Sequence, residues 1–136
     1  MCAGALAECK RPAAGLELRL APVPPAAAEA REFVRDRLPV LGLFHLAENA
    51  TLVAAELVTN SLKYAPEGPI WLSLHLAGVG LLMEVQDCSA RLPVFREPDY
   101  VAESGRGLHL VAALCESLGW IALDGGKVIW ALLEKE

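Results

Sequence analysis

The stretch from Ala54 to Ala65, AAELVTNSLKYA, constrains the fold more than any other part of the chain. It continues a helical spacing, and on a helix Glu56 and Asn60 lie within about 40° of each other. Beside this pair runs a mostly apolar arc made of Leu46, Ala50, Val53, Ala54, Leu57, Val58 and Ser61. A carboxylate and an amide at the edge of a buried stripe can hold a hard cation or a water molecule. The alternative is a solvated helix face.

The composition is that of an ordinary globular domain. The chain has 136 residues, of which 54% are hydrophobic and 21% are charged. A chain of this size buries most of the surface that its unfolded form exposes, so a single core is expected without disulfide staples. We predict a flexible N-terminus over residues 1–14 and a single domain over residues 15–136.

The charge and the cysteines narrow the function classes further. A net charge of −5 and the absence of a basic run argue against direct nucleic-acid binding. Charges, Gly or Pro interrupt every apolar segment before it could span a bilayer, so we expect no membrane segment. Glu8 interrupts the apolar stretch that a signal peptide would need, so we expect a cytoplasmic location. The four cysteines lack C-x-x-C spacing, so no zinc site is indicated and we expect reduced thiols.

The rest of the chain mixes two periods. Alternation predicts strands over residues 16–20, 70–76, 81–87 and 128–133, with a hairpin at Gly78-Val79-Gly80 and a tight turn at Asp124-Gly125-Gly126. Three- and four-residue spacing predicts helices over residues 26–38, 45–64 and 108–118. The last strand is apolar on both faces, so it should be central or covered by helices.

Asp87 breaks the alternation of its strand. It falls on the same face as Met83 and Val85, which are core residues by pattern. An acid at the end of a core-facing row is costly unless something pairs with it. The position therefore favours a ligand contact.

Residues 88–104 and the start of the following helix also stand out. The segment has neither period, which is typical of a lid or binding loop, although disorder without function is the alternative. Gly105-Arg106-Gly107 then opens a helix, where backbone N–H groups can bind an anion. A Rossmann motif is excluded because these glycines do not follow a strand, and a Walker P-loop is excluded because Gly-Lys-Ser/Thr is missing.

The order of these features resembles the histidine-kinase-like ATPase superfamily, and within it the small anti-sigma factor serine/threonine kinases. The resemblance covers roughly residues 16–133 and rests on the strings ELVTNSLKYA, DCSARLP and GRGLHLV. It implies an α/β (α+β) two-layer sandwich, in which a mostly antiparallel mixed sheet of four to five strands is covered on one face by three helices. A long ATP lid is also implied.

The resemblance further implies roles for single residues, with ATP and Mg²⁺ as cofactors. Glu56 would be the general base, and Asn60 would hold the Mg²⁺ that bridges the ATP phosphates. Asp87 would accept a hydrogen bond from the adenine amino group, with Ser89 in the same nucleotide-binding box. The last group, Gly105, Arg106, Gly107 and Leu108, would wrap the phosphates.

Three positions depart from the family pattern. Tyr64 stands where many members have histidine. Ser89 stands where the family usually has glycine, and Val128 stands where relatives often have a threonine near the nucleotide.

Because of these departures two functions stay open. The first is an ATP-dependent serine/threonine kinase that phosphorylates an anti-anti-sigma partner of the STAS type and otherwise binds a sigma factor. The second is a nucleotide-sensing module, responding to ATP or ADP, that sequesters a sigma factor or another regulator without phosphorylating it. The resemblance also implies a homodimer.

Overall fold

The computed structural model describes residues 15–78, 80–91 and 107–134. Its elements are, in chain order, β1 (Glu17–Leu20), α2 (Ala26–Arg37), a short 3-10 helix η1 (Phe44–Leu46), α3 (Ala47–Tyr64), β2 (Ile70–Ala77), β3 (Gly80–Asp87), α4 (Gly107–Leu114), β4 (Ser117–Leu123) and β5 (Gly126–Glu134). The expected N-terminal segment over residues 1–14 and most of the expected lid lie outside the described residues.

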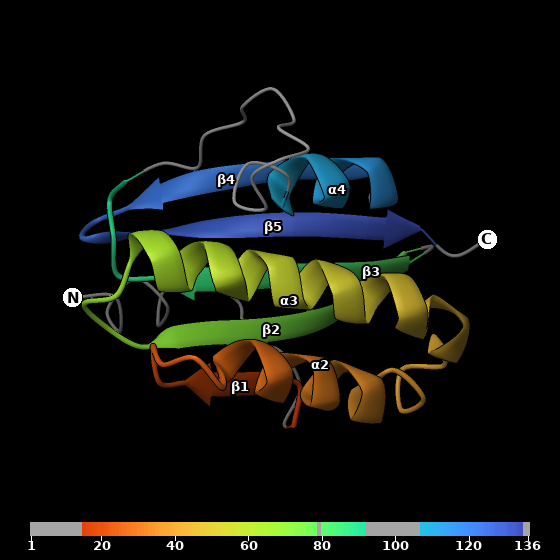
Figure 1. The fold of residues 1–136 in the computed structure, drawn as a ribbon. Coiled ribbons are helices and arrows are strands. Elements are labelled where there is room, and N and C mark those ends of the chain that lie inside the picture. Colours follow the sequence, from red (N-terminus) through yellow and green to blue (C-terminus); the bar gives the residue numbers. More distant parts are fainter. Residues whose placement is uncertain (1–14, 79, 92–106, 135–136) are drawn as a thin grey trace, which may run out of the picture.

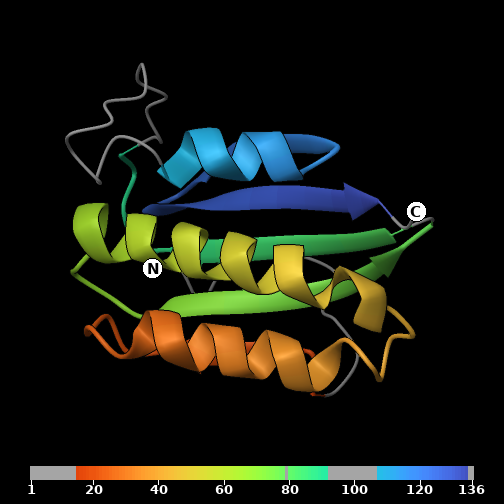
Figure 2. The ribbon, with the colours of Figure 1, turned by 45° about the vertical axis from the view of Figure 1, so that its right-hand side comes forward.

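The strands form one five-stranded sheet in the order β1-β2-β3-β5-β4. Each neighbouring pair is antiparallel. Helices α2, α3 and α4 lie side by side on one face of this sheet, as two views show (Figure 1 and Figure 2). The two-layer sandwich predicted from the sequence is confirmed, and β5 is a central strand as its apolar faces indicated.

Prolines set the ends of the two long helices. Helix α2 begins directly after Pro25 and ends at Arg37, two residues before Pro39. Helix α3 ends at Tyr64, two residues before Pro66. Proline disfavours a helical conformation in the residue before it and cannot donate to the helix ladder, so each helix stops where the sequence requires.

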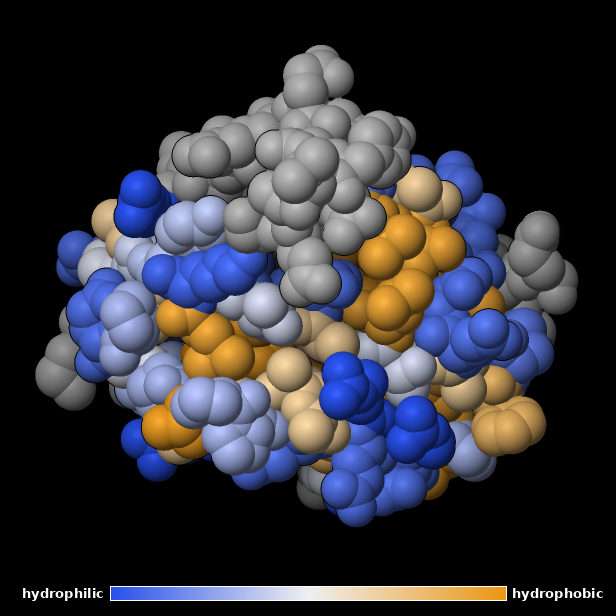
Figure 3. All heavy atoms as spheres, in the orientation of Figure 1, coloured by the Kyte–Doolittle hydropathy of each residue, from blue (hydrophilic) through white to orange (hydrophobic). Residues whose placement is uncertain are grey.

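The core lies between the helices and the sheet. Helix α3 contributes its apolar arc, with Val53 and Leu57 fully buried, and strands β2, β3 and β5 contribute the inward row of each strand. Burying one such side chain stabilises the fold by about 1.5–3 kcal/mol. Viewed from the helix side, the apolar surface that remains is divided into separate patches by hydrophilic side chains (Figure 3).

The described cysteines differ in state. Cys88, just after β3, is disulfide-bonded, so the expectation of reduced thiols is wrong for this residue. Cys115 is free and follows α4, where it packs against the core. Burial raises the pKa of the Cys115 thiol to about 11, so this thiol stays protonated and poorly nucleophilic near neutral pH. Among the described residues, no helix is both long enough and apolar enough to cross a membrane.

Two glycines of the sheet allow a test of its close packing. A Cβ at Gly80 would lie 2.0 Å from the backbone oxygen of Leu133, whereas a Cβ at Gly119 would lie 2.5 Å from the ring of Trp130. A backbone cannot move without breaking its ladder, but a side chain can rotate away. We predict that Gly80→Ala lowers the free energy of unfolding by about 2–3 kcal/mol and that Gly119→Ala lowers it by less. Urea unfolding followed by circular dichroism measures both, and equal losses would contradict this packing.

Candidate functional site

Helix α3 carries the first two candidate residues at the edge of its buried face. Glu56 and Asn60 are each partly exposed, while Ala55, Leu57 and Ser61 beside them are buried. One turn of helix separates the pair, so both side chains lie along the same edge. Glu56 has no hydrogen bond or ion pair with any other described residue, which leaves its carboxylate open to a ligand.

Asn60 has an unusual feature. Its Oδ1 atom is buried and accepts no hydrogen bond within the part of the chain that the structure describes. A buried acceptor without a partner costs free energy, and in native proteins it usually has a ligand, an ion or a water molecule as its partner. The amide oxygen is therefore available to a donor or a cation that belongs to something other than the described residues.

The donor set agrees with Mg²⁺ better than with a transition metal. The described residues contain no group of three His, Cys, Asp or Glu side chains that could enclose a metal ion. Mg²⁺ does not need such a group, because it keeps several waters and is held by one or two protein oxygens together with substrate phosphates. The Asn60 amide oxygen, with the Glu56 carboxylate one turn away, fits that requirement.

Asp87 is the last residue of β3 and lies next to the C-terminal part of α3, which carries Asn60. Figure 1 shows the last turn of α3, the end of β3 and the start of β5 at one side of the molecule. The side chain of Asp87 is fully buried, and its Oδ2 accepts a hydrogen bond of 2.7 Å from the Ser61 hydroxyl. Since Ser61 follows Asn60, the contact brings the two candidate segments together.

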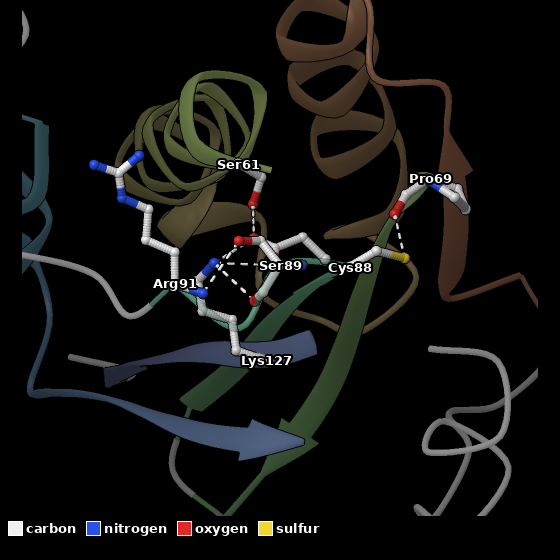
Figure 4. Close-up of polar contacts among 7 residues, drawn as sticks. Ser61, Pro69, Cys88, Ser89, Arg91 and Lys127 are labelled. Atoms are coloured by element: carbon white, nitrogen blue, oxygen red, sulfur yellow. Dashed lines mark hydrogen bonds and ion pairs between the residues drawn. The ribbon is translucent and has the colours of Figure 1, made fainter. Parts of the chain in front are cut away.

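Three further hydrogen bonds reach the Asp87 carboxylate (Figure 4). The backbone N–H of Ser89 donates to Oδ1 at 3.1 Å. The ammonium group of Lys127 donates to Oδ1 at 2.9 Å and to Oδ2 at 3.0 Å. Lys127 lies on β5 directly opposite Asp87, and both side chains are almost completely inaccessible to solvent. The acid that breaks the strand pattern is thus one half of a buried ion pair.

Sequence reasoning missed Lys127, although a signal for it exists. Lys127 falls in the same alternating row as Ile129 and Ala131, so it is a charged residue at the end of a core-facing row, like Asp87. The same alternation turns Val128 to the face away from the helices, where it pairs with Gln86. Lys127, and not Val128, therefore supplies the β5 side chain beside Asp87. A threonine hydroxyl at position 128 would point away from Asp87, so its absence does not alter the surroundings of this carboxylate.

Ser89 is used inside the chain. Besides its N–H, its hydroxyl accepts a hydrogen bond of 3.1 Å from the backbone N–H of Arg91. The guanidinium of Arg91 lies 5.1 Å from the centre of the Tyr64 ring, at the last residue of α3. Such a cation–π contact at an exposed site contributes about 0.5–1 kcal/mol. The chain leaving β3 is thereby held against the end of α3.

The remaining candidates belong to the start of α4. Gly105 and Arg106 lie outside the described residues, and Gly107 is the first residue of α4. Leu108 is buried and belongs to the hydrophobic core, so its side chain serves packing, and only its backbone remains for the role expected of it. Helix α4 packs against α3, the helix that carries Glu56 and Asn60.

Comparison with known proteins adds a likeness of fold. No model of a protein family and no curated protein matches the sequence. A solved structure, that of the RsbU and RsbW domains of Rv1364c from Mycobacterium tuberculosis, matches with a TM-score of 0.63 and 19% sequence identity. The match covers 87% of this chain and 32% of that chain, so this chain spans about a third of its length. At this identity the likeness concerns the fold.

The buried ion pair predicts a large effect on stability. Lys127→Met leaves the Asp87 carboxylate buried without its countercharge, and we expect the free energy of unfolding to fall by about 3–5 kcal/mol. The double variant Asp87→Leu/Lys127→Met removes both charges and should regain a large part of that loss. Urea unfolding measures both variants.

Lys63→Met serves as the matched control, because Lys63 is an exposed residue of α3. Its effect should stay within about 0.5 kcal/mol. If Lys127→Met were as mild as this control, the ion pair would have no part in holding the sheet and α3 together.

Proposed function

We propose that this chain is a regulatory protein of the anti-sigma type that binds Mg²⁺-ATP and transfers the γ-phosphate to a serine of a protein partner. The observation that carries the proposal is the buried, unpartnered Oδ1 of Asn60, one helical turn from the carboxylate of Glu56. Two oxygen groups of this kind fit the donor set that a magnesium–phosphate complex requires. The likeness of fold to a structure that includes an RsbW domain supports the regulatory part.

The residues of α3 divide the chemistry between them. The Asn60 amide oxygen would bind Mg²⁺, which supplies positive charge against the phosphate oxygens. The Glu56 carboxylate would accept the proton of the attacking serine hydroxyl. The serine oxygen forms the new bond to the γ-phosphorus while the bond to the β–γ bridging oxygen breaks, and ADP leaves. In-line transfer of this kind depends mainly on positioning and charge neutralisation.

Position supports this division of roles. Glu56 is partly exposed, so a partner's hydroxyl could reach its carboxylate, whereas the Asn60 oxygen is buried and suits a small ion better than a protein side chain. The proposed partners are a small anti-anti-sigma protein of the STAS type as phosphoryl acceptor and a sigma factor as the regulated protein. A homodimer is proposed as the functional form.

A second function is favoured by a specific observation. The polar groups around Asp87 are satisfied by the chain itself, since Ser61, Ser89 and Lys127 all donate to it. Because these groups need no ligand to satisfy them, they favour a module that binds nucleotide with low affinity and sequesters a partner without phosphorylating it. Phosphate transfer distinguishes this module from the kinase.

Replacement of Asn60 tests the metal-binding role. With Asn60→Ala, the Mg²⁺-dependent part of ATP affinity should be lost, so that affinities measured with Mg²⁺ and with a chelator become equal. Isothermal titration calorimetry measures this. Asn49→Ala is the matched control, because Asn49 is an exposed residue of the same helix, and it should keep the wild-type dependence on Mg²⁺. If the wild-type chain bound no ATP in millimolar Mg²⁺, both proposed functions would be wrong.

Replacement of Glu56 tests the proton acceptor. Glu56→Gln keeps the size of the side chain but removes its basicity, and loss of a general base lowers rates by about 10²–10⁴-fold. We expect transfer of labelled γ-phosphate to a panel of STAS-type proteins to fall by this factor when ATP is saturating. Glu48→Gln, at an exposed position of the first turn of α3, should transfer at the wild-type rate.

Transfer that persists in Glu56→Gln would remove Glu56 from the mechanism. ATP binding without transfer to any protein of the panel, in the wild type as well, would favour the sequestering module over the kinase.

A further inference from the structure

The carboxylate of Asp87 has no acceptor site left for a ligand. A carboxylate offers about four lone-pair sites, two on each oxygen. Oδ1 receives the Ser89 N–H and the Lys127 ammonium, and Oδ2 receives the Ser61 hydroxyl and the same ammonium. Donors from the chain therefore fill all four sites.

Lys127 cannot easily be moved from this position. Its ammonium has three N–H donors, of which two point at Asp87 and the third at the backbone oxygen of Ser89, 3.5 Å away. The side chain is fully buried and starts from the strand position directly opposite Asp87. Displacing it would leave two buried charges without partners, which is much more costly than breaking a neutral hydrogen bond.

The amino group of a nucleobase is a weaker donor than this ammonium. The Lys127 ammonium carries a full positive charge and a nucleobase amine does not, so the ammonium is attracted more strongly to the buried carboxylate. If a nucleobase amine took the place of Lys127 at the Asp87 carboxylate, a weaker interaction would replace a stronger one. The buried ammonium would also be left without a countercharge. The carboxylate would keep Lys127 even with a nucleotide present.

We propose that Lys127 is a specificity-determining residue that acts as a built-in donor to Asp87, so that the chain does not select a nucleotide by the amino group of its base. This inference rests on the proposed function in assuming that the site by Asn60 takes a nucleoside triphosphate. The ligand class is then a Mg²⁺-bound triphosphate held by its phosphates, with little discrimination at the purine 6-position.

The test compares two ligands that differ only in that amino group. ATP and purine riboside 5′-triphosphate, which lacks the 6-amino group, are titrated into the full wild-type chain in Mg²⁺ by calorimetry. We expect dissociation constants within fivefold of each other. A site with a free buried acceptor would favour ATP by about tenfold or more, because the analogue leaves that acceptor unsatisfied. A preference for ATP above fivefold would overturn the proposal.

Removing the built-in donor should create the missing selectivity. Lys127→Ser frees the acceptor sites of Asp87, and we expect a preference for ATP over the analogue of at least tenfold. Lys63→Ser, at an exposed position of α3, should keep the wild-type ratio. If Lys127→Ser fails to fold, Asp87→Asn/Lys127→Ser retains an amide oxygen as acceptor without a stranded charge, and the same gain is expected. An unchanged ratio in the folded variant would overturn the proposal.

These outcomes separate the inference from the function on which it rests. A wild-type chain that binds both triphosphates equally supports both, and one that strongly prefers ATP overturns the inference alone. If the wild type binds neither triphosphate, the proposed function fails. The inference then fails as well, because it assumes a triphosphate that the wild-type chain binds by its phosphates.

Discussion

The ion pair between Asp87 and Lys127 holds together one end of this protein. It joins opposite positions of β3 and β5, and the Ser61 hydroxyl adds α3 to the same carboxylate. Two charges removed from water are stable only when their remaining lone pairs and protons are satisfied, and here they are. The apolar face of α3 packs on the sheet, and the Ser61 hydrogen bond adds a polar contact to Asp87 at the residue next to Asn60.

The two polar features at this end have opposite character. Around Asp87 each acceptor site is filled from within the chain, whereas the Asn60 oxygen, one residue before Ser61, is buried and unfilled by any described residue. The filled carboxylate of Asp87 offers a ligand no further hydrogen bond, whereas a ligand that donates to the Asn60 oxygen would remove the free-energy cost of a buried acceptor without a partner. The proposed binding mode, in which Mg²⁺ and phosphates are held at Asn60 and Glu56, would use the second feature and not the first.

Much of this could be predicted from particular residues. The alternation of β3 placed Asp87 among core side chains, and the structure agrees, because an extended chain turns every second residue to the same face regardless of its type. Lys127 was missed because the apolar run was read from Val128 onward, one residue too late. The side chain of Leu108 packs in the core, and a phosphate contact through its backbone stays a prediction.

By itself the sequence determined the layered fold, three helices and four of the five strands, since periodicity and turn chemistry act over a few neighbouring residues; β4 was not predicted, and the helix expected over residues 108–118 ends at Leu114. Only the tertiary structure decided which polar groups meet. Asp87 and Lys127 are 40 residues apart, and Ser61 and Asp87 are 26 apart. A buried charge requires a partner, but the sequence does not say which one, because strand register and helix packing bring it there. The same long-range packing leaves Asn60 without one among the described residues.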